Sequence, residues 1–595
     1  MLKTSIAFEN GKPYISVDGE LYSPLAYTTY FEECGEFSDF IKAGYKMFFI
    51  NVSFTDHPIN NVTGFSPFLT GVFEKEEPDY SEFDSLIEKI IEECPDALIF
   101  PRINIAMPRK WVEENIAETV ETPTGRRESL GSEVFLHDGT ELLIKLVSHI
   151  RGADYSERIA GYQLCGGTTQ EWMHHDMAGS FSEKSLEKFR QWAKEKYNKN
   201  DLPSIAKDDL FKGEFDETVS LYGEYCSIMA SSAVEHFSKK LKAFINNEQV
   251  VGVFYGYNVF VNDYLLGLLG LRFIIDSPYI DFFSSPCCYD FNRKLGVDWG
   301  DMVPPVSLNF HGKLYFVECD IRTYLTKGMQ FSRPGKYPEN IYLTEDENGN
   351  KTVWSGPENL DLSVSAIRKA FAHQITKGSG IWWFDMWGGW YKDEKIMAEM
   401  KKMKEIAQGS VNKIAEAFPT AETVMFIDEE AYLNCPRESC YRHSPNETRH
   451  ELGNTGVPFD LAMVEDAEGI LHRYKAAIFT APLMSEKGKE AVKLCEEMGI
   501  PYIKTTTEKN NFKRNELREF LTSNRVHCYN EEENVVYCGD GFLAIHAVND
   551  GRTKIKLPEK FKVKNLFGDV QAEENETDEI TFTAEKYHTY IFELF

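Results

Sequence analysis

The sequence has no hydrophobic run long enough to cross a membrane. A spanning helix needs about 20 consecutive apolar residues, and the longest apolar stretches, such as residues 264–275, are shorter and include Arg272. Residues 1–12 contain no apolar segment typical of a secretory signal. We therefore expect a cytoplasmic protein without a membrane partner.

The chain also has no excess of positive charge and no organised cysteines. Its 64 basic residues are outnumbered by 94 acidic ones, and the net charge of −30 would repel the phosphates of nucleic acid. This acidity suits a neutral or cationic substrate, although it is equally typical of any soluble protein. The 12 cysteines are scattered. Cys435 and Cys440 lack the second ligand pair of a zinc site, so we expect reduced thiols.

Motifs for several common chemistries are absent. No G-x-G-x-x-G turn follows the first predicted strand, and neither a P-loop nor a serine-hydrolase elbow occurs. These absences argue against an open, nucleotide-binding doubly wound sheet. Nothing in the sequence calls for a metal ion or an organic cofactor, and we expect none.

What the sequence does contain is a regular alternation of short apolar runs and helical patterns up to about residue 405. Helical spacing of apolar residues is clearest at 80–93, 142–150, 218–244, 263–274 and 362–376. Eight strands with intervening helices predict a (β/α)8 TIM barrel over residues 1–405. The predicted strands are 23–30, 45–52, 97–105, 159–165, 250–257, 279–285, 313–317 and 380–385.

The pattern changes after the predicted barrel. Short strands at 423–427, 476–479 and 502–504, with a helix at 487–498, predict a small flavodoxin-like α/β domain over 406–524. No phosphate-cradling loop follows these strands, which favours a structural or assembly role. Consecutive short strands separated by turns then predict an antiparallel β-sandwich over 525–595.

Two glutamates follow the fourth and the seventh predicted barrel strands. Glu171 and Glu318 would therefore meet at the carboxyl-terminal mouth of the barrel, where active sites lie. Two facing carboxyl groups are the minimum needed to cleave a glycosidic bond. The nearby Arg322 would hold Glu318 ionised as a nucleophile, and the neighbouring Trp172 would desolvate Glu171 and raise its pKa as an acid requires.

Further polar and aromatic residues at the predicted strand ends are candidates for binding a sugar, which needs aromatic platforms and directed hydrogen bonds. Any single tryptophan is as easily explained by core packing, and structural roles are equally open for Asp385 and Tyr257. His174 is a candidate for substrate contact or support rather than for metal binding. A long polar loop at 328–359 should lie on the active-site side. The candidates are Arg102, Asn104, Gln170, Trp172, His174, Tyr257, Tyr289, Arg322, Trp383, Asp385, Trp387 and Trp390.

The two glutamates, the tryptophan-rich segment 382–390 and the segment 100–111 resemble the retaining-glycosidase clan of TIM barrels. The order of the three domains looks most like glycoside hydrolase family 42, the β-galactosidases with a flavodoxin-like trimerisation domain. The resemblance implies Glu171 as acid/base, Glu318 as nucleophile and a homotrimer.

One departure from the family bears on the sugar. The clan usually places Asn before the acid/base glutamate, where it bonds the sugar 2-hydroxyl, but this chain has Gln170. We expect an exo-acting retaining β-glycosidase that takes an oligosaccharide or glycoside, with β-galactosidase as the first expectation. A β-mannosidase or another β-glycosidase of the same layout is the alternative. A non-catalytic carbohydrate-binding protein is the alternative of a different class.

Overall fold

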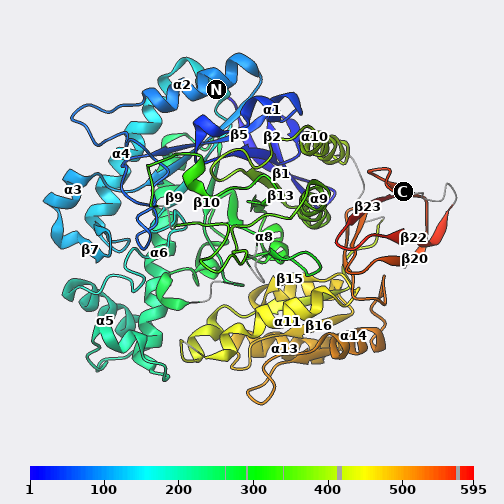
Figure 1. Cartoon of the computed structure of the whole chain (residues 1–595). Coiled ribbons are helices and arrows are strands. Elements are labelled where there is room, and N and C mark those ends of the chain that lie inside the picture. The colour runs from blue at the N-terminus through cyan, green and yellow to red at the C-terminus, as the bar shows by residue number, and fades with distance from the viewer. Residues whose placement is uncertain are drawn as a thin grey trace.

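The computed structural model of the protein describes most of its 595 residues, and Figure 1 shows their arrangement. A barrel built from the first two thirds of the chain carries an α/β unit on one side, and the C-terminal β-strands lie beside both that unit and helix α9 of the barrel. Among the described residues, no helix is both long and apolar enough to cross a bilayer. The described residues are 1–260, 263–287, 289, 293–338, 341–411, 418–437, 439–570 and 576–595.

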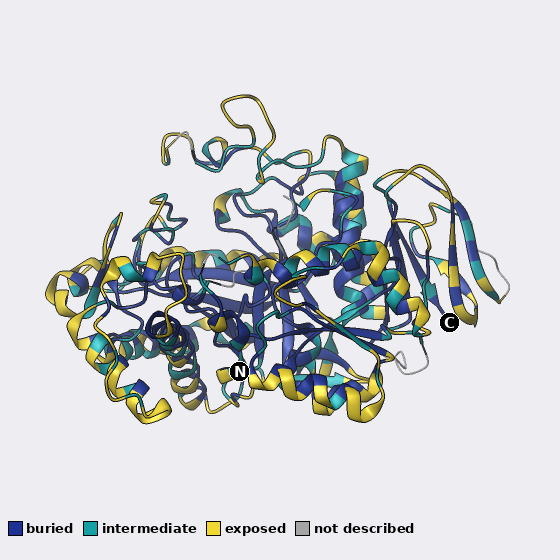
Figure 2. Ribbon diagram, turned by 90° about the horizontal axis from the view of Figure 1, so that it is seen from below, coloured by how far each residue is buried: buried dark blue, intermediate teal, exposed yellow. Residues whose placement is uncertain are grey.

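Eight parallel strands close into a barrel in the order β10-β11-β12-β13-β4-β5-β6-β9. Each lies in or overlaps one of the eight runs predicted from the sequence, so the TIM barrel is confirmed. Their side chains are almost all buried, as expected for strands covered on both faces (Figure 2). The strands are β4 (Leu25–Thr28), β5 (Met47–Ser53), β6 (Leu98–Ile105), β9 (Gly161–Gly166), β10 (Val250–Phe254), β11 (Phe282–Pro286), β12 (Leu314–Cys319) and β13 (Gly380–Phe384).

Helices surround the barrel and present exposed outer faces (Figure 2). The helix predicted over 263–274 is wrong, because the chain there forms a short turn at Tyr264–Leu266 and then α7 (Leu271–Ile274). Gly267, at φ +90°, ends the first turn and breaks the helix. The main outer helices are α1 (Phe37–Lys42), α2 (Ser81–Glu93), α4 (Glu133–Gly152), α6 (Glu217–Phe244), α8 (Pro305–Phe310), α9 (Leu360–Lys377) and α10 (Glu394–Gly409).

Aromatic rings fill the interior of the barrel. Phe49 stacks on Phe100 with ring centroids 4.9 Å apart and on Trp382 at 5.6 Å, and its edge meets Phe316 at 5.3 Å. Phe282 packs against the same group, 5.9 Å from Phe316. Because these side chains come from five strands and are buried, the barrel is a packed core rather than a pore. A substrate can therefore approach only at the mouth.

Several small elements were not predicted. An antiparallel sheet of β1 (Thr4–Glu9), β2 (Lys12–Val17) and β3 (Glu20–Tyr22) precedes the barrel. The hydroxyl of Thr4 donates to the carbonyl of Ala160, which fixes this sheet to the chain just before β9. A hairpin of β7 (Thr119–Thr122) and β8 (Gly125–Glu128) stands after β6, and α5 (Glu183–Tyr197) lies in a long insertion after β9.

The α/β unit after the barrel contains a parallel sheet in the order β15-β14-β16-β17, the order that begins a flavodoxin-like sheet. The sequence predicted β14 (Thr423–Ile427), β16 (Ala476–Phe479) and β17 (Tyr502–Lys504), but not β15 (Asp460–Met463). The helices of the unit are α11 (Ser444–Gly453), α13 (Glu486–Met498) and α14 (Arg514–Ser523).

The C-terminal strands are antiparallel, as predicted. One sheet has the order β18-β19-β23-β21, and β20 pairs with β22 in a second. Both sheets contribute to one hydrophobic core. The strands are β18 (Val535–Gly539), β19 (Phe542–His546), β20 (Gly551–Phe561), β21 (Val563–Asn565), β22 (Thr577–Ala584) and β23 (Thr589–Leu594). The boundaries 406–524 and 525–595 stay predictions.

A buried carboxylate joins the α/β unit to the barrel. Glu429, which follows β14 and is fully buried, accepts hydrogen bonds from the amide of Asn258 at 3.3 Å and the backbone N–H of Leu271 at 3.1 Å. Its second oxygen accepts from the backbone and the guanidinium of Arg272, each at 3.1 Å. Arg272 also reaches Glu224 on α6. The start of α7 is thereby tied to the end of β14.

Replacing this carboxylate should weaken the junction. We expect Glu429→Gln to destabilise the protein by about 3 kcal/mol, because one partner of a buried ion pair is lost. Urea unfolding followed by intrinsic fluorescence measures the effect as a lower midpoint. Glu508→Gln, at an exposed position of the same unit, is the matched control and should leave the midpoint unchanged. Equal midpoints for both variants would contradict the role given to Glu429.

Candidate active site

The two predicted catalytic glutamates meet at the carboxyl end of the barrel. Glu318 is the penultimate residue of β12 and lies in register with Pro286 on β11 and Trp382 on β13. Glu171 follows β9 and forms a bridge with Gly166, the last residue of that strand. The negative charge of Glu171 raises the pKa of Glu318. The two carboxyl groups therefore share one site.

Glu171 is carried by a turn with an unusual backbone. Gly167, Thr169, Gln170 and Trp172 all have left-handed conformations, with φ of 65°, 58°, 70° and 58°. Such values are uncommon for residues other than glycine and signal stored strain. The turn is closed by the N–H of Trp172, which donates to the carbonyl of Gly166 at 2.7 Å. Strain of this kind persists only where surrounding contacts fix the backbone.

Those contacts centre on Asn61, which is 1% exposed in the loop after β5. Its backbone N–H donates to the hydroxyl of Thr168, and its side-chain amide bonds the imidazole of His175 at 2.8 Å. Its side-chain oxygen Oδ1 accepts hydrogen bonds from the Thr124 hydroxyl and from the Arg127 guanidinium. Asn61 thus bonds residues on both sides of Glu171, namely Thr168 before it and His175 after it.

A second layer holds His175 itself. Its other ring nitrogen lies 2.9 Å from the carboxylate of Glu128, the last residue of β8. Burial and the Arg127 charge lower the pKa of His175, so the ring is neutral and the Asn61 amide can donate to it. The unpredicted hairpin of β7 and β8 therefore supports the turn that carries Glu171.

The environment of Glu171 suits a proton donor. Burial raises its pKa to about 7, against the opposing effects of hydrogen bonds from Thr169 and Tyr257 and of the Arg102 charge. The Thr169 hydroxyl donates to the Glu171 carboxyl at 2.6 Å. The side chain keeps partial exposure, so it can reach a ligand. Near neutral pH a substantial fraction of this carboxyl group is protonated.

Glu318 lies deeper, with 2% exposure. Burial and the charges of Asp320 and Glu171 raise its pKa, while Arg102 and Arg293 oppose the rise. Burial and the repulsion between the two carboxylates therefore both favour protonation of the pair. The prediction that Arg322 would hold Glu318 ionised is wrong, because Arg322 donates to Asp320 at 2.7 Å instead.

Arg102 is the cation closest to the floor of the site. Its guanidinium is fully buried and lies over the rings of Phe254 at 4.8 Å, Trp382 at 5.1 Å and Tyr30 at 5.3 Å. One nitrogen donates to Asn51 at 3.4 Å, while Nε and one Nη have no hydrogen-bond partner among the described residues. The cation is thus stabilised by aromatic faces and by the carboxylate above it.

Three further candidates point polar atoms into the site. The charges of Glu171 and Glu318 both raise the pKa of Tyr257, and those of Asp320 and Glu318 raise that of Tyr289. Gln170 is fully buried, and neither atom of its amide has a partner among the described residues. Because buried polar groups are normally paired, these atoms are suited to bind a hydroxylated ligand. Asn104 lies on the same inward face and donates to Ser53.

Trp172 and His174 lie away from the two carboxyl groups. The Trp172 indole N–H donates to the Leu164 carbonyl at 3.2 Å, and its ring packs on Phe237 of α6. The His174 ring lies 2.8 Å from the Cys226 carbonyl on the same helix. Both anchor the turn of Glu171 to α6 rather than line the mouth.

On β13 the inward residue is Trp382, not the predicted Trp383. Successive side chains of a strand face opposite ways, and Glu318 is in register with Trp382. The Trp383 indole therefore points outward and donates to Tyr45 at 3.0 Å. Asp385 accepts the backbone N–H of Trp390 at 3.1 Å, and burial raises its pKa to about 8. Asp385 thus shapes the loop after β13.

Trp387 and Trp390 belong to an aromatic wall. Trp387 packs on Trp390 at 5.2 Å, on Trp354 at 5.3 Å and on Tyr342 at 5.8 Å. Trp354 and Tyr342 come from the long loop predicted on this side. The wall reaches the catalytic pair, because the Glu171 charge raises the pKa of Tyr342. Individual residues of that loop had no sequence signal beyond their aromatic character, whereas Tyr30 was signalled by its place at the end of the first predicted strand.

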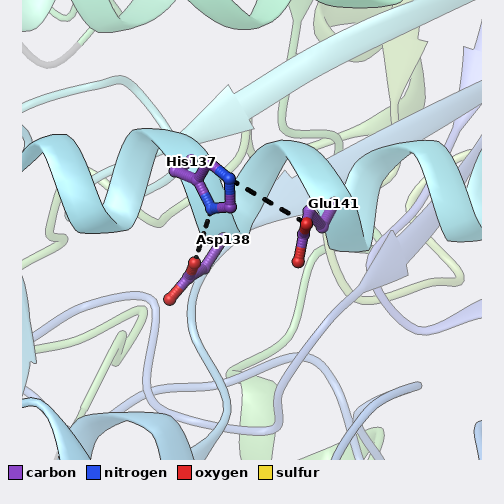
Figure 3. A group of neighbouring side chains, drawn as sticks. All are labelled: His137, Asp138 and Glu141. Carbon is purple, nitrogen blue, oxygen red and sulfur yellow. Dashed lines mark hydrogen bonds and ion pairs between the residues drawn. The ribbon is translucent and has the colours of Figure 1, made fainter.

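One cluster of possible metal ligands occurs among the described residues. His137, Asp138 and Glu141 lie together on α4 (Figure 3). His137 and Glu141 are exposed, and Asp138 accepts the indole N–H of Trp111. Its contacts are those of ordinary helix-surface ion pairs.

Comparison with known proteins identifies the architecture. No protein-family profile and no curated protein matches the sequence. Gan42B, a GH42 β-galactosidase from G. stearothermophilus, superposes with a TM-score of 0.64 at 11% identity over 96% of this chain and 98% of that chain. An exo-carrageenase GH42 from Bacteroides ovatus gives 0.60 at 12% identity over 100% and 85%. The chain therefore shares its fold with these two proteins over nearly its whole length.

The raised pKa of Glu171 makes a prediction about stability. The folded protein holds this proton up to about pH 7, whereas an unfolded chain loses it near the ordinary pKa of about 4.5, so folding stability falls as pH rises between these values. Glu171→Gln removes that loss and should stabilise the protein at pH 8 by up to about 3 kcal/mol.

Thermal unfolding at pH 8 and pH 4 measures this difference. The Gln variant should melt higher than the unchanged protein at pH 8, and the gap should close at pH 4. The surface variant Glu508→Gln should show no such pattern. A gap that is equal at both pH values would contradict the assigned protonation.

Proposed function

We propose that the protein is an exo-acting retaining β-glycosidase whose first substrate class is the β-galactosides. The observation that carries the proposal is the pairing of Glu171, with a pKa of about 7, and Glu318 at the ends of β9 and β12. The GH42 fold supports it, since one structural neighbour is named a β-galactosidase and another an exo-carrageenase.

In the proposed mechanism the pair shares its proton in the free enzyme. When the glycosidic oxygen reaches Glu171, the proton settles there and passes to the leaving oxygen, while the anionic Glu318 attacks the anomeric carbon. Arg102 and Arg293 stabilise the anion of Glu318 before the attack. Water then attacks the anomeric carbon while the Glu171 carboxylate takes its proton, and Glu318 leaves as a carboxylate.

The aromatic wall supports exo action. Tyr342 and Trp354 are partly exposed and can offer ring surface to the apolar face of a terminal sugar, while the buried Trp387 and Trp390 support them from behind. Gln170 occupies the place before the acid, where the clan usually has Asn. A β-mannoside or another β-glycoside is therefore the alternative substrate within the same chemistry.

A non-catalytic carbohydrate-binding protein is the alternative of a different class. It would need no proton donor, whereas burial here raises the pKa of Glu171 to about 7. We also infer a homotrimer formed through the α/β unit, which the family resemblance suggests. Light scattering tests the trimer.

The first test is hydrolysis of a panel of p-nitrophenyl glycosides. The β-galactoside should be cleaved, and Glu318→Gln should lose about a thousandfold or more of kcat/KM because the nucleophile is gone. Glu171→Gln should lose activity mainly on unactivated disaccharides, since p-nitrophenol needs little protonation to leave.

The surface variant Glu508→Gln is the active control. Full activity of Glu318→Gln on the panel, or full activity of Glu171→Gln on unactivated disaccharides, would contradict the mechanism. Cleavage of a β-mannoside instead would keep the mechanism and change the sugar. Sugar-dependent thermal stabilisation without any cleavage would favour the binding protein.

A second test concerns the pH profile and Asn61. Activity should fall above pH about 7 as Glu171 loses its proton. Asn61→Ala should release the strained turn and so misplace the acid, which lowers kcat by roughly 10- to 100-fold. Because Glu171 then gains contact with water, the fall of activity on the basic side of the pH profile should move to lower pH. KM should change little.

Asn530→Ala, at a buried asparagine outside the barrel, controls for general destabilisation. It should leave both kcat and the pH limb unchanged. A kcat loss in Asn61→Ala with an unmoved pH limb would mean that Asn61 acts only through stability.

A further inference from the structure

A cationic cavity lies directly behind the end of β12. It has a volume of about 410 Å³ and is lined by Ile321 and Arg322, by residues of the loop 351–358, by the beginning of α9 and by Tyr587. Its volume falls in the range of small-molecule sites, about 300–1,000 Å³. The cavity belongs to no step of the proposed mechanism.

Its charge is opposite to that of the protein as a whole. Four cationic side chains line it, namely Arg293, Lys294, Arg322 and Lys351, against one lining carboxylate, Glu358. The whole chain carries a net charge of −30. A concentration of cations in so acidic a chain is a local feature that attracts anions.

The two arginines are fixed in place by one carboxylate. Asp320 is fully buried and accepts hydrogen bonds from both Arg293 and Arg322. Arg322 is further held between Trp354 at 4.6 Å and Trp390 at 5.5 Å. Its Nε and one Nη have no hydrogen-bond partner among the described residues, although the side chain is only 5% exposed. One buried negative charge thus orders two positive ones.

The two lysines stand at the rim of the cavity. Lys294 is exposed and forms no ion pair among the described residues. Lys351 is 52% exposed and lies 3.7 Å from Glu358, a long and solvent-screened contact. Both ammonium groups can turn toward a ligand at little cost.

The chemistry of these groups selects the ligand. Guanidinium and ammonium groups bind sulfate and carboxylate oxygens by charge-assisted hydrogen bonds. Apolar side chains between the cations, among them Leu295, Trp299 and Tyr587, suit the C–H face of a sugar ring. An anionic saccharide meets both requirements, whereas a free inorganic anion would use only the first.

We propose that this cavity holds an anionic substituent, a sulfate ester or a carboxylate, on a sugar unit next to the one that is cleaved. The inference rests on the proposed glycosidase function. Asp320 connects the two places, since it bonds both cavity arginines and its charge acts on both catalytic glutamates. The enzyme then prefers charged over neutral oligosaccharides of the same sugar.

The test compares matched disaccharides that differ in one sulfate or one carboxylate on the non-cleaved unit. At least one charged form should show a kcat/KM about tenfold or more above the neutral form, as expected for two charge-assisted hydrogen bonds. The double variant Lys294→Met/Lys351→Met should abolish that preference through KM. Lys336→Met, an exposed lysine outside the cavity, should retain it.

The charged substrates and the double variant distinguish the possible outcomes. Preference for the sulfated or the carboxylated substrate identifies the anion. Equal kcat/KM for charged and neutral substrates, or a preference that survives in the double variant, overturns the proposal while leaving the glycosidase intact.

If no disaccharide is cleaved, the proposed function fails, and thermal shift with the same disaccharides still tests the cavity. Stabilisation by the charged forms beyond the neutral form, lost in the double variant, supports the cavity. Equal stabilisation overturns it.

Discussion

The site depends on a positive charge buried inside the barrel. Arg102 has no solvent to stabilise it, so its charge is balanced by aromatic faces such as Trp382 below and by the Glu318 carboxylate above. An unpaired charge at this depth would be too costly to keep. The aromatic plug, the inward parity of β6 and β12 and the position of Glu318 are consequences of the same requirement.

Strain supplies the second constraint. Four left-handed residues carry Glu171 into a desolvated position, and neither the strain nor the desolvation favours folding. The cost is offset away from the mouth, where Asn61, His175 and Glu128 form a buried, hydrogen-bonded chain. Such a division, with a strained site and a rigid support, is what preorganisation of a proton donor requires.

The barrel could be predicted because its strands are continuous apolar runs, and the glutamates could be placed because strand ends converge. Side-chain direction was less accessible. Trp383 was the predicted sugar-binding residue, although Trp382 is the one that points into the barrel. A strand buried on both faces has no alternation of apolar and polar residues, so its sequence does not show which side chains point inward. Arg322 was paired with Glu318 from proximity in sequence, whereas Asp320, two residues nearer, takes its charge. The supports Asn61, in the loop after β5, and Glu128, on β8, are distant in sequence from Glu171 and have no local signal.

Charge balance explains how two chemically identical side chains can take different roles. Three carboxylates and three guanidinium groups lie at this end of the barrel. The carboxylates belong to Glu171, Glu318 and Asp320, and the guanidinium groups to Arg102, Arg293 and Arg322. Asp320 has two of the cations as direct partners. Arg102 acts on both glutamates, but only Glu318 also has Arg293 among the main charges that lower its pKa. Once a ligand offers an oxygen to the partly exposed Glu171, the lower energy arrangement leaves the proton there and the negative charge beside the arginines. In the proposed mechanism, position among the cations, rather than residue type, separates the acid from the nucleophile.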